Sequence, residues 1–176
     1  YSANLLNQAV TVDLVAGTAN DGLGNTDTIA GFEYVITGAG NDDITGSSEA
    51  NSIVSGDGND TIAGGAGADT IVAGNGDDVV IGGLGADSLV GGSGTDTLDY
   101  SANLSNQAVT VDLVGGTAND GLGNADTIVG FEYVITGAGN DDITGSDDAN
   151  SIVAGAGSDT IAAGNGEDTV VAGDGA

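Results

Sequence analysis

The sequence contains no lysine, arginine or histidine in its 176 residues, so its 27 acidic side chains have no basic partner and the net charge is −27. Without cations, the chain has no electrostatic basis for binding the phosphates of nucleic acid or an anionic lipid surface. No apolar run approaches the roughly 20 residues that span a bilayer. We therefore expect no nucleic acid partner and no membrane span.

Cysteine, methionine, proline and tryptophan are absent as well. The lack of cysteine excludes a disulfide scaffold. Because histidine, cysteine and lysine are all missing, no such side chain can activate a serine or threonine nucleophile. Paired carboxylates can cleave glycosides, but almost every acid here has a place in a repeat. We predict that the chain is not an enzyme and has no catalytic residues.

Glycine, aspartate and β-branched residues dominate what is present. There are 34 glycines, and only four of the 27 acids are glutamate. Such a charge normally favours disorder, yet 39% of the residues are hydrophobic, and valine, isoleucine and threonine suit pleated strands. These two signals conflict unless a bound cation neutralises the carboxylates.

A long repeat of 99 residues organises the chain, because the segment Tyr1–Gly46 returns almost unchanged at Tyr100–Gly145. Residues 1–99 form the first long repeat, with spacer coils at 1–36 and shorter repeats at 37–99. Residues 100–176 form a second, truncated copy, with spacer coils at 100–135 and shorter repeats at 136–176. We expect one continuous solenoid and interpret the chain as an excerpt from a longer tandem array.

The shorter repeat is nine residues long, as in SGDGNDTIA (55–63) and GGAGADTIV (64–72). Glycine takes the second and fourth positions, aspartate the sixth and an aliphatic residue the eighth. This pattern resembles the RTX-type calcium-binding nonapeptide repeat family, found in secreted bacterial proteins such as adhesins, surface-layer proteins and the C-terminal domains of serralysins. The resemblance implies an all-β fold: a parallel β-roll or β-solenoid with two nonapeptides per coil and several Ca²⁺ ions in its loops.

The spacing fits that architecture physically. Glycines permit a tight six-residue loop, and the next three residues make a short strand whose eighth-position side chain points into a narrow core. Loops 18 residues apart then stack, so we expect one ladder at Asp42, Asp60, Asp78 and Asp96, and another at Asn51, Asp69 and Asp87. Stacked carboxylates lie about 5 Å apart and repel by about 1 kcal/mol per pair even in water, so the calcium-free chain is expected to be largely unfolded.

The family resemblance implies that each ion bridges two stacked loops, through sixth-position carboxylates and the carbonyls of early loop residues. The expected carboxylate ligands are Asp42, Asp60, Asp69, Asp78, Asp87, Asp96, Asp141, Asp159 and Asp168. The expected carbonyl ligands are Gly38, Gly40, Gly56, Gly58, Gly65, Gly67, Gly74, Gly76, Gly83, Gly85, Gly92, Gly94, Gly137, Gly139, Gly155 and Gly157.

Some units depart from the pattern. Asn51 and Asn150 replace the sixth aspartate, so their loops are expected to be weak or vacant metal sites. In the spacers, Asp27 and Asp126 precede a strand and are candidate ligands. The spacer aromatics are expected to pack in the core or at coil ends: Phe32, Tyr34, Phe131 and Tyr133.

These observations favour a calcium-binding structural repeat module of a large secreted or cell-surface bacterial protein, such as an adhesin, surface layer or filament. The resemblance implies type I export of an unfolded chain that folds and stiffens on extracellular calcium. The alternative is a carbohydrate- or ice-binding module, which would favour exposed aromatics or a regular threonine ladder. Expected partners are calcium, neighbouring repeats of the same array, and a second copy through lateral self-association of a column at Val54, Val72 and Val90. Simple strand propensity explains that column equally well.

Overall fold

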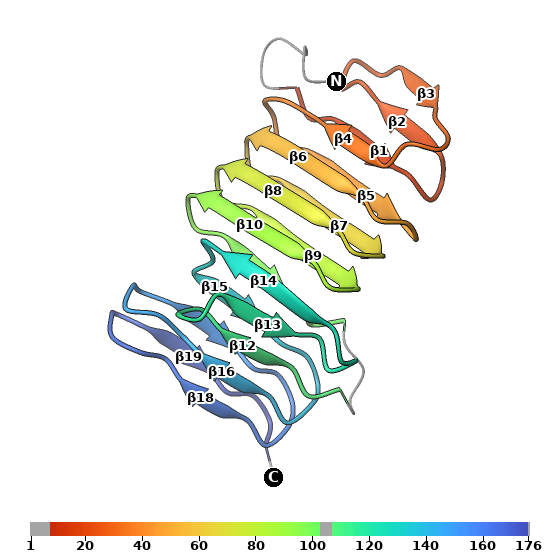
Figure 1. The fold of residues 1–176 in the computed structure, drawn as a ribbon. Coiled ribbons are helices and arrows are strands. Elements are labelled where there is room, and N and C mark those ends of the chain that lie inside the picture. Colours follow the sequence, from red (N-terminus) through yellow and green to blue (C-terminus); the bar gives the residue numbers. More distant parts are fainter. Residues whose placement is uncertain (1–7, 103–106, 176) are drawn as a thin grey trace.

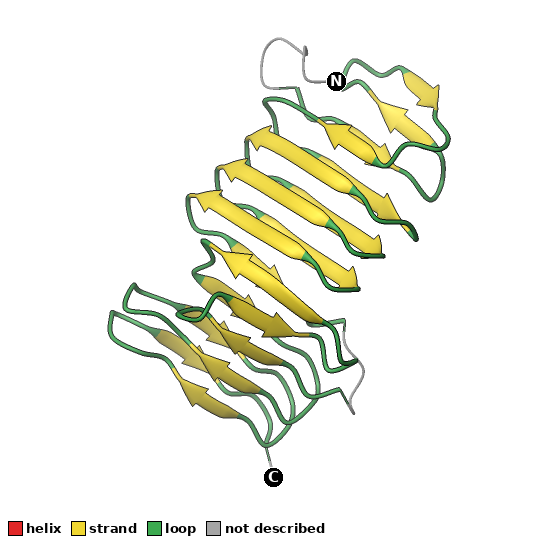
Figure 2. Cartoon of the chain, in the orientation of Figure 1, coloured by secondary structure: helices red, strands yellow, loops and turns green. Residues whose placement is uncertain are grey.

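The computed structural model describes residues 8–102 and 107–175. Those residues form nineteen strands joined by loops and turns (Figures 1 and 2). The described part of the chain has no helix, and therefore none that could cross a membrane. The all-β prediction is confirmed.

The strands form two sheets that face each other along the solenoid. One has ten strands, in the order β3-β2-β1-β5-β7-β9-β11-β15-β17-β19, and the other has nine, in the order β4-β6-β8-β10-β14-β13-β12-β16-β18. The ten-stranded sheet contains β1 (Thr11–Asp13), β2 (Thr18–Asn20), β3 (Thr26–Thr28), β5 (Asp43–Ser47), β7 (Thr61–Ala66), β9 (Val79–Leu84), β11 (Thr97–Asp99), β15 (Tyr133–Ile135), β17 (Ser151–Val153) and β19 (Thr169–Val171). The nine-stranded sheet contains β4 (Tyr34–Ile36), β6 (Ser52–Asp57), β8 (Thr70–Asn75), β10 (Ser88–Ser93), β12 (Thr110–Asp112), β13 (Thr117–Asn119), β14 (Ala125–Val129), β16 (Asp142–Thr144) and β18 (Thr160–Ala162).

Within the nonapeptide blocks, each strand pairs in parallel with the strand 18 residues away. Ile44 of β5 lies opposite Ile62 of β7, and Ile53 of β6 lies opposite Ile71 of β8. Successive nonapeptides alternate between the two sheets, so two units complete one coil. The predicted parallel β-roll is confirmed.

The spacers differ from simple coils because each begins with an antiparallel meander. In the second spacer β12 pairs antiparallel with β13, and β13 pairs antiparallel with β14. This meander fits between β10 and β16, with which its outer strands pair in parallel. The first spacer forms the corresponding meander from β1, β2 and β3 at the end of the ten-stranded sheet.

The core is a narrow column of eighth-position side chains between the two sheets. These residues have no exposed surface: Ile44, Ile53, Ile62, Ile71, Val80, Leu89, Leu98, Ile143 and Ile152. The flanking seventh and ninth positions are half-buried or exposed, apart from Thr97. Each nonapeptide therefore contributes about one large apolar group to the core, which leaves much of the stabilisation to the loops.

Candidate calcium sites

The loops between the sheets depend on glycine at the second and fourth positions of each unit. Gly56 and Gly58 have φ angles of 118° and 134°, a region that other residues rarely adopt. A Cβ atom at these positions would lie 2.2 Å and 2.0 Å from the carbonyl oxygens of Gly38 and Gly40 in the preceding coil. The glycines therefore let the backbones of successive coils approach closely, and they line the loop edges with columns of carbonyl oxygens.

One oxygen of each sixth-position carboxylate ties two coils together. The main-chain N–H of Asp42 donates to Oδ1 of Asp60 at 2.8 Å, that of Asp60 to Asp78 at 2.8 Å, and that of Asp78 to Asp96 at 3.0 Å. On the other edge, the N–H of Asn51 donates to Asp69 at 2.7 Å, and that of Asp69 donates to Asp87 at 2.8 Å. The expected 18-residue stacking of both ladders is confirmed.

The second block repeats this arrangement. The N–H of Asp141 donates to Asp159 at 3.0 Å, and the N–H of Asn150 donates to Asp168 at 2.9 Å. Asp159 and Asp168 are less buried than their counterparts in the first block, because they lie in the last coils of the described chain.

The other carboxylate oxygen is buried and has no hydrogen-bond partner among the described residues. This holds for Oδ2 of Asp42, Asp60, Asp69, Asp78, Asp87, Asp96, Asp141 and Asp159. A buried polar group without a partner costs about 1–3 kcal/mol, and a charged one costs more. These oxygens are what a row of bound cations would satisfy.

Burial disfavours the charged form of these carboxyl groups and therefore raises their pKa. Loss of solvation raises the pKa of the carboxyl groups of Asp60, Asp69, Asp87 and Asp96. For Asp78, burial together with repulsion from Asp60 and Asp96 raises the pKa to about 6. A cation beside these carboxylates would oppose both effects.

The available donors fit calcium. In residues 8–102 and 107–175, no three acidic side chains gather into a metal-binding group, so backbone carbonyls must supply part of any ligand shell. Such oxygens do converge: a Cβ at Gly64 would lie 2.6 Å from Oδ2 of Asp69 and 2.6 Å from the carbonyl oxygen of Gly82 in the next coil. An all-oxygen set of carboxylates and carbonyls suits Ca²⁺, whereas structural zinc sites use cysteine and histidine.

The two asparagine-bearing loops offer less to a cation. Oδ1 of Asn51 accepts the N–H of Ser47 at 2.6 Å, and its Nδ2 is buried without a partner. Asn150 repeats this arrangement with Ser146 at 2.7 Å. Neither side chain presents an unused carboxylate oxygen, which supports the expectation that these loops bind calcium weakly.

The two spacer aspartates lie in different surroundings. Asp27 is exposed on β3. Asp126 is buried and continues a ladder, since its Oδ1 accepts the N–H of Asp87 at 2.9 Å. However, Oδ2 of Asp126 accepts the hydroxyl of Tyr100 at 2.5 Å, so a phenol takes the position that is unsatisfied elsewhere in the ladder.

The first nonapeptide block meets the second spacer where β10 and β11 pair with β14 and β15, a contact that we call the seam. Sequence reasoning missed two residues at the seam, Tyr100 and Glu132. Oε2 of Glu132 accepts the N–H of Asp96 at 2.9 Å, so glutamate occupies the next position of the ladder. Glu132 follows Asp96 by 36 residues, twice the coil length, and that spacing could have identified it. Tyr100 carried no comparable signal, because its contact depends on the path of the spacer.

Comparison with known families agrees with this geometry. The model of the RTX calcium-binding nonapeptide repeat matches the chain four times, at residues 36–71, 63–98, 129–161 and 144–176. The matches cover nearly all of both nonapeptide blocks and most of neither spacer. A comparison with curated proteins gave no significant match.

Proposed function

The chain belongs to the RTX calcium-binding nonapeptide repeat family, and from that premise we propose that it is a calcium-stiffened segment of a large secreted or cell-surface bacterial protein. An adhesin, a surface layer and a filament are the settings that a long repetitive rod suits best. The coarser role, a calcium-binding structural module, follows from the repeat family itself.

One observation carries the proposal: the columns of buried carboxylate oxygens without partners. When bound, calcium supplies positive charge and coordination to these oxygens. Asp60, Asp69 and Asp78 show the arrangement: each aspartate is tied to a neighbouring coil through Oδ1, while its Oδ2 is buried without a partner. Binding energy at such sites becomes folding energy, so the rod would be rigid only when calcium is present.

The charge supports an exported location. With a net charge of −27 and no cation in the sequence, the chain repels itself strongly where calcium is scarce. RTX repeats typically occur in secreted proteins. A chain that stays unfolded at cytosolic calcium and folds outside the cell fits export before folding.

Calorimetric titration of the chain with calcium tests this proposal. We expect binding coupled to folding, several ions per chain, and dissociation constants of about 0.1–1 mM, as in extracellular calcium modules. Magnesium serves as the control and should bind poorly, because it demands smaller, near-octahedral sites. Saturation at calcium levels typical of the cytosol, or equal binding of magnesium, would contradict the proposed role.

A further inference from the structure

The loop between β14 and β15 is a shortened form of the nonapeptide loop. Only Gly130, Phe131 and Glu132 connect the two strands, whereas a nonapeptide loop has six residues. The segment TIVGFEYVI (127–135) nevertheless keeps glycine at the fourth position of a unit and an aliphatic residue at the eighth. That aliphatic residue, Val134, is fully buried opposite Leu98. Glu132 therefore occupies the sixth position, where the other units of the ladder have aspartate or asparagine.

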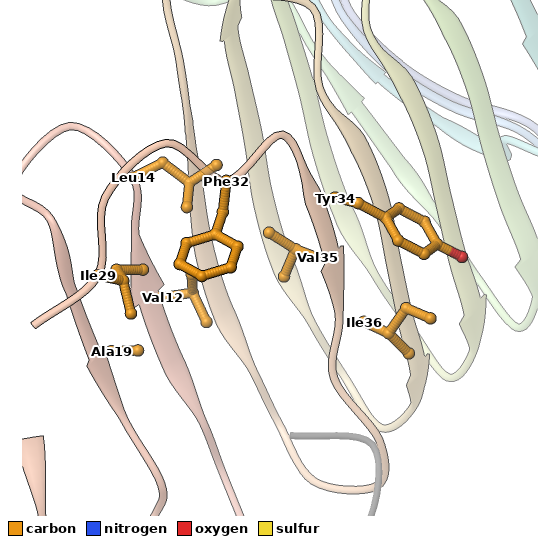
Figure 3. A pocket seen from close by; sticks show the side chains of 8 residues that line it. All are labelled: Val12, Leu14, Ala19, Ile29, Phe32, Tyr34, Val35 and Ile36. Carbon is orange, nitrogen blue, oxygen red and sulfur yellow. The ribbon is translucent and has the colours of Figure 1, made fainter. Parts of the chain in front are cut away.

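The phenylalanine of this short loop anchors it to the core. Phe131 is 5% exposed and belongs to the apolar cluster between the sheets. Figure 3 shows the same motif in the first spacer, where Phe32 lies beside Val35 while Tyr34 projects from the other side of β4. In both copies the phenylalanine turns towards apolar side chains. In the second spacer this leaves Glu132 half-buried at the edge of the loop.

Three oxygen-bearing groups converge where this loop meets the last coil of the first block. Oε2 of Glu132 accepts the N–H of Asp96 at 2.9 Å. Asp96 has no exposed surface, and its Oδ2 has no hydrogen-bond partner among the described residues. A Cβ at Gly91 would lie 2.6 Å from that Oδ2 and closer still to the carbonyl oxygen of Gly130. A carboxylate oxygen and a carbonyl of the next coil meet in the same way at Gly64 inside the block.

The two carboxylates at this point have no positive side chain to offset them. Burial, followed by repulsion from Glu132 and Asp77, raises the pKa of the Asp96 carboxyl group. The sequence contains no lysine, arginine or histidine. A buried charged oxygen without a partner destabilises a fold more than a neutral one does. Calcium coordinates carboxylate and carbonyl oxygens together, so it fits the groups that this point offers.

The opposite edge of the seam is built differently. Asp126 holds the ladder position there, but its Oδ2 accepts the hydroxyl of Tyr100. Among the described residues, the atoms nearest to a Cβ at Gly82 belong to Asp87 and Leu89 and not to a spacer carbonyl. This edge therefore combines a satisfied carboxylate with no converging carbonyl, and it offers no counterpart of the oxygens around Asp96.

We propose that the seam carries its own calcium site on one edge, with the carboxylates of Asp96 and Glu132 and the carbonyl oxygen of Gly130 as ligands. The proposal rests on the proposed function, since it assumes calcium in the ladders, and it adds an ion that joins a nonapeptide block to a spacer. Glutamate suits this position because its extra methylene compensates for the shorter loop. The opposite edge is held by Tyr100 and Asp126 without metal, so the calcium ladder continues into the spacer on one side of the solenoid only.

Removing the charge of Glu132 alone tests the site. Glu132→Gln keeps an oxygen that can accept the N–H of Asp96 but loses the carboxylate. Glu49→Gln is the matched control, because it makes the same chemical change at an exposed residue of the Asn51 loop. Equilibrium dialysis of the 176-residue chain with radioactive calcium counts the ions bound at saturation, and circular dichroism verifies that each variant folds. We expect Glu132→Gln to bind one ion fewer than the wild type, and Glu49→Gln to bind the same number.

A second variant separates charge from hydrogen bonding. Glu132→Asp keeps the carboxylate on a side chain that is one methylene shorter. It should bind the full number of ions, with a calcium concentration at the folding midpoint that is several-fold higher than that of the wild type. If Glu132→Gln does not fold at any calcium concentration while Glu132→Asp does, the seam requires the charge and not only an acceptor, which supports the site.

Two results would overturn the seam site. Equal ion counts in the wild type and Glu132→Gln would leave the seam with hydrogen bonds alone. If both Glu132 variants fail to fold while Glu49→Gln folds, the shape of the glutamate and not a bound ion determines the contact. A wild type that binds no calcium at all would contradict the proposed function as well, so the two failures are distinguishable.

Discussion

Each sixth-position aspartate divides its two carboxylate oxygens between two tasks. Oδ1 accepts a main-chain N–H from the preceding coil, as Asp78 does from Asp60, and in all of them except Asp168 the Oδ2 is buried without a partner among the described residues. The first task requires only an acceptor, which an asparagine also provides. The second requires a charged oxygen, which an asparagine lacks. At Asn51 the buried atom without a partner is the amide Nδ2 instead of a carboxylate oxygen.

Asp78→Asn should therefore raise the calcium concentration at the folding midpoint by about tenfold, the effect of losing roughly 1.4 kcal/mol of binding. Asp78 lies between Asp60 and Asp96 in its ladder, so the change affects the contacts on both sides. The control Asn51→Ala removes a side chain that offers no free carboxylate oxygen and should shift the midpoint clearly less. Equal shifts in a calcium titration followed by circular dichroism would argue against the stacked sites.

The raised pKa of Asp78, about 6 in the calcium-free fold, predicts a pH dependence. An unfolded aspartate titrates near 3.8, so between these two values the folded state binds more protons than the unfolded state. The free energy of unfolding without calcium should then increase as the pH falls from 7 towards about 4. In chelator, the β signal should be larger near pH 5 than at pH 7, and the calcium midpoint should be higher near pH 5 because protons compete for the same oxygens. A calcium midpoint that is unchanged between these pH values would contradict this.

At the scale of elements, the spacer meander joins the two nonapeptide blocks. Tyr100 immediately follows β11, and its hydroxyl reaches Asp126 on β14, whose Oδ1 accepts the N–H of Asp87. Burial, followed by the contact with Asp126, raises the pKa of the Tyr100 hydroxyl far above its usual range, so the phenol stays protonated and keeps donating. The seam is therefore held by a hydrogen bond that needs no metal.

Tyr100→Phe should lower the free energy of unfolding of the calcium-loaded chain by about 1–3 kcal/mol, because it leaves a buried carboxylate oxygen without its donor. Tyr133→Phe is the matched control, since Tyr133 is only half-buried, and it should change stability by less than 1 kcal/mol, roughly the limit for a site away from such features. Denaturant melts in saturating calcium measure both. If the two variants lose the same stability, the Tyr100 bond is not what holds the seam.

The nonapeptide strands could be predicted from the sequence because each unit is self-contained. A glycine loop, one carboxylate and one aliphatic residue recur every nine positions, so register and burial follow from counting. The spacers could not be predicted in this way. Their meander turns on segments such as Asp120-Gly121, a turn signal that does not specify which sheet the strands join. The sheet depends on the number of preceding half-coils. Seven nonapeptides and the two half-coils of the spacer, its meander and β15, make an odd total, so β5 and its copy β16 lie in opposite sheets.

At the scale of the whole molecule, the solenoid combines a thin core with a large uncompensated charge. A column of single aliphatic side chains spans the nonapeptide blocks, while 27 acids face no cation in the chain. Repulsion within the ladders alone is of order 1 kcal/mol per pair in water and larger where the groups are buried. The summed repulsion is comparable to the free energy of unfolding of a typical domain, which is roughly 5–15 kcal/mol. We propose that bound calcium reverses this balance.

Far-ultraviolet circular dichroism with and without calcium tests this central claim most directly. With millimolar calcium, the chain should give a β-rich spectrum. Excess chelator should convert it to a coil-like spectrum, calcium should restore it, and magnesium should not. A chelated chain that keeps its β spectrum at neutral pH would contradict the claim that calcium makes this sequence fold.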